Sequence, residues 1–129
     1  MPDITDLIEQ ARKSVEAGQP ATAEVFYQII GRDTKLLKSG VERVAHGEAC
    51  VFFAVLALKK NRLGEAGDWY REALDADPAC AEYRIDMAMR VYLPIGMLDS
   101  ARIEAKRAAQ LEPGNVRAWR AIAGIEHEA

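Results

Sequence analysis

The chain has 129 residues, of which 50 % are hydrophobic and 29 % are charged, as is typical of one soluble globular domain. Its 17 lysines and arginines against 20 aspartates and glutamates give a net charge of −3, which argues against a dedicated nucleic-acid binder. The longest apolar run, residues 49–58, is shorter than the roughly 20 residues of a membrane-spanning helix. The acidic N-terminal residues lack a signal-peptide pattern. We therefore expect a cytoplasmic protein without membrane insertion.

The first third of the chain predicts two helices and then an irregular stretch. An apolar stripe at helical spacing ends at Gly18-Gln19-Pro20, and a second stripe follows it at Ala23, Tyr27 and Ile30. We interpret residues 3–31 as a divergent helical hairpin. Residues 32–46 fit no repeat and are expected to form an irregular helical connector, with added helix suggested by Leu36, Leu37, Val41 and Val44.

The rest of the chain contains an internal repeat. Ala66, Tyr70, Ala73 and Pro78 recur as Ala101, Ala105, Ala108 and Pro113, with a period of 35 residues. A period of this size is typical of stacked helical hairpins, in which small residues let helices approach closely and the proline ends each unit. We therefore predict repeats at 47–80 and 81–115. A final helix over 116–129 would cap the stack after an N-cap at Asn115.

Within these repeats the sequence predicts approximate helix boundaries. The first unit should contain helices over residues 48–60 and 64–76. The second unit is one residue longer, and we place the extra residue near 93–96, where Pro94 should end the first helix early.

These motifs resemble a known family. The set Ala66, Tyr70, Ala73 and Pro78 resembles the second-helix signature of the tetratricopeptide repeat, and Trp119 with Ile122 and Ala123 resembles the opening of its first helix. The resemblance implies an all-α fold, a short right-handed solenoid of antiparallel helical hairpins with about seven helices. It also implies that the first helix of each pair lines a concave, partner-binding side.

The predicted partner-binding groove is apolar in its middle, acidic beside that and basic at its C-terminal end. It is expected to contain Val51, Phe52, Val55, Leu58, Glu82, Ile85, Asp86, Met89, Tyr92, Arg117 and Arg120. The same apolar helices could instead be covered by residues 32–46 or by a second copy of the chain, because large apolar surfaces are rarely left bare.

The resemblance also bears on the type of ligand. Relatives that grip the acidic tails of heat-shock chaperones use lysine and asparagine on successive first helices. The corresponding positions here hold Ile8, Arg12, Phe52, Glu82 and Asp86. We therefore do not expect a carboxylate clamp.

No residue pattern indicates catalysis, a metal site or a cofactor. His46 is expected on the connector and His127 near the chain end, each without a suitably spaced second ligand, and Cys50 and Cys80 are expected to be structural. Trp119 is expected in the inter-helix core, and Trp69 partly exposed on an outer helix.

The leading hypothesis is a non-catalytic protein–protein interaction module, an adaptor or small chaperone that binds a peptide or helix. Two alternatives remain open. One is a docking or regulatory module of a glycosyltransferase- or methyltransferase-type enzyme, which a longer reading frame would reveal. The other is a self-assembling scaffold, a homo-oligomer that stacks head to tail through Trp119, Ile122 and Ile125.

Overall fold

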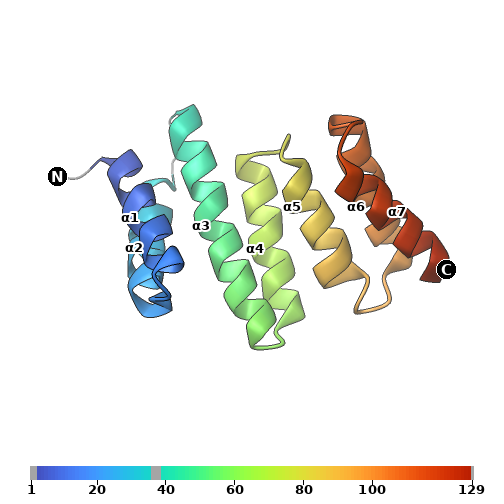
Figure 1. Cartoon of the computed structure of the whole chain (residues 1–129), viewed down its shortest axis with the longest axis horizontal. Coiled ribbons are helices and arrows are strands. Elements are labelled where there is room, and N and C mark those ends of the chain that lie inside the picture. Colours follow the sequence, from blue (N-terminus) through green and yellow to red (C-terminus); the bar gives the residue numbers. More distant parts are fainter. Residues whose placement is uncertain (1–2, 36–38, 129) are drawn as a thin grey trace.

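The computed structural model describes residues 3–35 and 39–128, and this part of the chain is entirely helical (Figure 1). The predicted all-α fold of seven helices is confirmed within these residues. The predicted helical positions Leu36 and Leu37 lie outside the described residues. The helices are α1 (Ile4–Glu16), α2 (Pro20–Asp33), α3 (Gly40–Lys59), α4 (Leu63–Ala76), α5 (Ala81–Asp86), continued by the π-helical segment η1 (Met87–Tyr92), α6 (Leu98–Leu111) and α7 (Val116–Glu128).

Local sequence signals explain where several helices begin and end. The Asp3 and Ser39 side chains accept hydrogen bonds from the backbone N–H of Asp6 and Glu42, and so cap α1 and α3. Pro20 occupies the first turn of α2, where its missing N–H costs no hydrogen bond. Gly18 turns the chain after α1 with a φ of 70°, a conformation that glycine adopts without steric cost.

Consecutive helices form antiparallel hairpins that stack side by side (Figure 1). We call α1, α3, α5–η1 and α7 the first helices, and α2, α4 and α6 the second helices. Neighbouring first helices pack on one another, α1 on α3 and α5 on α7, and together form what we call the first-helix face. The interior is rich in buried alanine, such as Ala66 and Ala101, which allows close helix packing.

Helix α3 begins earlier than the sequence predicted. It runs unbroken for 20 residues from Gly40, so residues 40–46 are its first two turns rather than an irregular connector, and they do not cover it. Position 47 of this helix favours glycine, because the β-carbon of any other residue would lie only 3.1 Å from the Tyr83 ring of α5. The glycine therefore permits close packing of two neighbouring first helices.

The first helix of the second repeat ends in a π-helical segment. Between Met87 and Tyr92 the backbone is π-helical, and beyond it the N–H of Leu93 donates to the carbonyl of Ala88 at 2.9 Å. Such i to i+5 bonds take up one more residue than an α-helical turn. The segment ends at Tyr92, so the first helix ends before Pro94, as expected. The connection from there to α6 covers residues 93–97 and includes the predicted place of the extra residue.

Candidate functional site on the first-helix face

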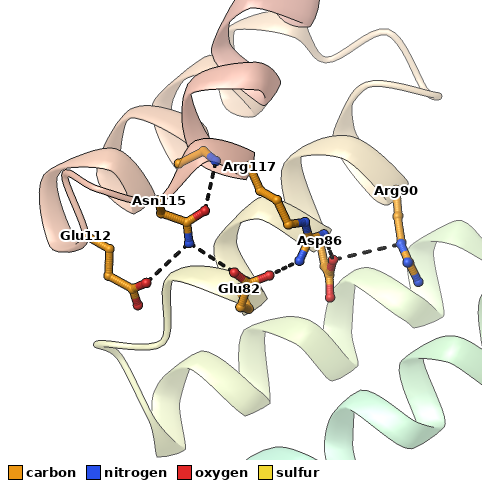
Figure 2. Close-up of polar contacts among 7 residues, drawn as sticks. Glu82, Asp86, Arg90, Glu112, Asn115 and Arg117 are labelled. Atoms are coloured by element: carbon orange, nitrogen blue, oxygen red, sulfur yellow. Dashed lines mark hydrogen bonds and ion pairs between the residues drawn. The ribbon is translucent and has the colours of Figure 1, made fainter.

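A polar cluster joins α5 to α7 at the C-terminal end of the first-helix face (Figure 2). Arg117 of α7 donates hydrogen bonds to Glu82 and, at 3.4 Å, to Oδ1 of Asp86. The Asn115 amide donates to Glu82 at 3.0 Å and to Glu112 at 3.2 Å, while its oxygen accepts from the N–H of Ala118. Asn115 is therefore the N-cap that the sequence predicted for α7. The structure brings three predicted groove residues together, Glu82, Asp86 and Arg117, as ion pairs within the chain.

Asp86 is the most buried carboxylate of this cluster. Burial raises the pKa of its carboxyl group, and the nearby Arg90 guanidinium, 3.9 Å away, partly opposes that shift. Burial likewise raises the pKa of Tyr70, beside the same carboxylate, to about 12. The arrangement therefore holds α7 on α5, and Asp86 and Arg117 are already engaged within the chain.

A shallow hollow of about 310 Å³ lies next to the cluster, between η1 and α7. Met89 and Arg120 line it, and the buried side chain of Ile85 lies beneath it. The terminal methyl of Met89 lies against Gly124 of α7. Arg120 is exposed and forms no ion pair within residues 3–35 and 39–128, so it offers a free positive charge beside an apolar floor.

The middle of the first-helix face is more tightly packed than the sequence suggested. Phe52 stacks on Tyr27 of α2 with ring centroids 4.5 Å apart, and Val51 and Leu58 pack against the core below. Glu48 accepts two hydrogen bonds of 2.8 Å from Arg12 of α1. Val55, another predicted groove residue of α3, is half-buried and is not part of the three groups of buried apolar residues that form the core.

A larger hollow of about 480 Å³ lies between α1 and the start of α3. Ile8, Val41 and Val44 give it an apolar lining, and Glu9 and Arg12 lie at its edge. The sequence interpretation missed this hollow because it assigned residues 32–46 to a connector. A signal was present, since Val41 and Val44 continue the stripe of Val51 and Val55 at helical spacing.

Two predicted groove residues differ from the expected placement. Ile85 is buried, so it contributes to the floor of the hollow at α7 instead of an exposed contact. Tyr92 lines a hollow between α4 and α6, where its hydroxyl accepts a hydrogen bond from Arg71 at 3.4 Å. The π-helical turn explains this placement, because it shifts the register of residues that follow it relative to a regular α-helix.

Trp119 is also placed differently from the prediction. Its side chain is 54 % exposed instead of buried between helices, and its indole N–H donates to the carbonyl of Pro113 at 2.8 Å. Together with Ile122 and the end of α6 it lines an apolar hollow of about 440 Å³. The exposed end of the helical stack is therefore apolar. Trp69 is half-buried on α4, as predicted, with its ring 5.1 Å from that of Phe53.

One group of metal-ligand side chains lies away from the first-helix face. His46, expected on a connector, is buried in α3, and it comes close to Cys50 of the same helix and Glu72 of α4. The four-residue spacing of His46 and Cys50 is visible in the sequence and would have indicated a possible pair of ligands.

The fold defines the class of protein: it is a helical-hairpin solenoid of the tetratricopeptide-repeat type, as the sequence resemblance implied. No protein-family description and no curated protein matches the chain. Among solved structures, the chain is similar to the first tetratricopeptide repeat domain of Spaghetti (RPAP3) bound to the HSP90 peptide SRMEEVD. That similarity has a TM-score of 0.70 at 17 % identity and covers 97 % of this chain and 91 % of the other. No helix in the described part of the chain is long and apolar enough to cross a membrane.

Proposed function

We propose that the chain is a non-catalytic protein-interaction module, an adaptor or small chaperone, that binds a peptide or amphipathic helix along its first-helix face. The observation that carries this proposal is the apolar hollow between α1 and α3, where Val41 and Val44 are exposed beside the side chain of Ile8. Val55 and Met89 extend the surface toward the second hollow at α7. An apolar stripe across parallel helices suits anchors spaced along a peptide.

The charges of this face favour an apolar ligand over an acidic one. Arg12 is held by Glu48, and Arg117 is held by Glu82 and Asp86, so neither is free to bind a carboxylate. Arg120 is the remaining groove arginine, and a single exposed cation gives little affinity. The ligand should therefore carry apolar anchors and at most one acidic group, at the part of the ligand that lies next to Arg120 of α7. The peptide SRMEEVD, bound by the structural neighbour, should bind this chain weakly.

The substitution Val44→Glu is expected to weaken binding of selected peptides at least about tenfold, because it places a charge in the apolar hollow. Peptides would be selected on the wild-type chain from a random library, and their affinities measured by fluorescence anisotropy. Val25→Glu on α2 is the matched control, since Val25 and Val44 are similarly exposed, at 55 % and 50 %. The control should bind as the wild type does.

Three results would contradict the proposed surface. They are wild-type binding by the Val44 variant, equal loss of binding in both variants, and loss of binding in the Val25 variant alone. Tight, saturable binding of SRMEEVD, not displaced by the selected peptides, would contradict the apolar character of the ligand. Circular dichroism of both variants shows whether the helices remain intact.

Self-association is a second candidate function, favoured by the apolar surface around Trp119 at the end of the stack. The predicted contact residue Ile125 is fully buried, so Trp119 and Ile122 would provide the interface. If this candidate is correct, light scattering should give a mass that rises with concentration, and Trp119→Ser should restore a monomer of 14.3 kDa. A monomer at all concentrations would exclude this candidate.

A further inference from the structure

Three side chains with different metal-binding atoms meet between α3 and α4. His46 and Cys50 lie one turn apart on the same side of α3, and Glu72 faces them from α4. A ring nitrogen of His46, the sulfur of Cys50 and a carboxylate oxygen of Glu72 all lie within 4.8 Å of one another. Zinc–ligand bonds of 2.0–2.3 Å place neighbouring ligands about 3–4 Å apart, so small side-chain movements would bring these three atoms to one cation.

The hydrogen bonds of His46 determine which of its nitrogens is available. The Thr34 hydroxyl lies 2.6 Å from the carbonyl of Ile30 and donates its hydrogen there. The same oxygen lies 2.9 Å from Nδ1 of His46, so it must accept a hydrogen bond from the Nδ1–H group. In the neutral ring, Nε2 therefore carries a lone pair that is directed toward Glu72.

This arrangement leaves two acceptors facing one another. Nε2 of His46 and Oε1 of Glu72 are 3.2 Å apart, and neither has a hydrogen to share when the imidazole is neutral. A cation between them removes the repulsion. A histidine that binds a metal through one nitrogen commonly donates its other N–H to a neighbouring oxygen, and Thr34 supplies that acceptor here.

The cluster can be reached from solvent. It opens into a cleft of about 380 Å³ between α2, α3 and α4, on the side of the second helices. His46 and Cys50 are buried at its base, whereas Glu72 is exposed at its rim. An ion could therefore enter past Glu72 and keep a position open to water.

We propose that His46, Cys50 and Glu72 bind a zinc ion, with a water molecule as the fourth ligand. The combination of thiolate, imidazole and carboxylate in a tetrahedral arrangement favours zinc over magnesium or calcium, which prefer oxygen ligands alone. When the metal–sulfur bond forms, the Cys50 thiol releases its proton to solvent. Without a metal, burial raises the pKa of Cys50 to about 12, so the thiol stays protonated.

The test uses the full chain, freed of metal by chelation and titrated with cobalt(II) chloride as a spectroscopic substitute for zinc. We expect one equivalent of cobalt to produce a thiolate-to-metal charge-transfer band together with the visible bands of tetrahedral cobalt, both abolished by added zinc chloride. Cys50→Ser should remove the charge-transfer band. Cys80→Ser, which removes the other free cysteine, should leave it unchanged.

A further variant keeps the proposal testable if Cys50→Ser does not fold. Glu72 is exposed, so Glu72→Gln should fold normally and should weaken cobalt binding about tenfold or more while keeping the sulfur band. Wild-type affinity in Glu72→Gln, a sulfur band that depends on Cys80, or no cobalt band at all would overturn the proposal. The cleft lies apart from the first-helix face, so the peptide-binding experiments neither support nor weaken this proposal.

Discussion

Replacing Tyr70 by alanine should lower the free energy of unfolding by about 3–5 kcal/mol, the largest effect expected of any single change in this chain. Tyr70 is fully buried on α4, where it packs among Ala54, Ala57 and Ala66 and against η1. Small neighbours cannot fill the space that the ring leaves, so the variant would contain a cavity in the middle of the stack. Urea denaturation followed by circular dichroism measures the change.

Tyr70→Phe is the matched control because it keeps the ring and removes only the hydroxyl. The Tyr70 hydroxyl is buried and makes no hydrogen bond of ordinary geometry within the described residues, although Arg90 and Asp86 lie close to it. Removing an unpaired buried polar group costs little and can stabilise a protein, so we expect stability to fall by less than about 0.5 kcal/mol or to rise. A loss of 2 kcal/mol or more in the phenylalanine variant would show that the hydroxyl is bonded in solution.

Breaking the ion pair between Arg84 and Glu104 should have the second-largest effect. Nη1 of Arg84 and Oε2 of Glu104 are 2.9 Å apart, and their side chains are only 17 % and 12 % exposed. The Arg84 guanidinium also donates to the carbonyl of Pro78. Because Glu104→Met leaves a positive charge largely buried without its partner, we expect a loss of about 3 kcal/mol.

A double-mutant cycle separates the pair from its surroundings. Combining Arg84→Met with Glu104→Met removes both charges, so the double variant should be more stable than either single variant. Asp68→Asn is the control, because the pair Asp68–Arg71 has the same 2.9 Å distance while Asp68 is 79 % exposed. That change should lower the free energy of unfolding by less than about 0.5 kcal/mol. Equal losses in Glu104→Met and Asp68→Asn would contradict a special role of the buried pair.

The repeated part of the fold could be predicted because its signal is local. Ala66, Ala73 and Pro78 recur one repeat later as Ala101, Ala108 and Pro113. Small and helix-ending residues at these spacings are compatible with few arrangements other than a helical hairpin. The start of α3 was harder to place. Gly40 and Gly47 lower the helix propensity there, and the close approach of Tyr83 to Gly47, which favours a glycine at that position, depends on a residue far away in the sequence.

The candidate site was less predictable because it depends on contacts between distant residues. The sequence contains Glu82, Asp86 and Arg117 but does not show that they pair with one another across α5 and α7. Similarly, the spacing of His46 and Cys50 is evident in the sequence, whereas Glu72 joins them only when α4 folds back on α3.

The π-helical segment has a consequence for how the chain tolerates change in its length. An extra residue in a regular α-helix rotates every later side chain by about 100°, which would turn an apolar face out of the core. Here the first helix contains a π-helical segment, Met87–Tyr92, and after a connection over residues 93–97 α6 directs Ala101 and Ala105 into the interior. Gly67 of α4 has no side chain, which leaves room for the side chain of Val91 in the π-helical segment. A π-helical turn of this kind lets a first helix take up one more residue than a regular α-helix while its later side chains still face the core.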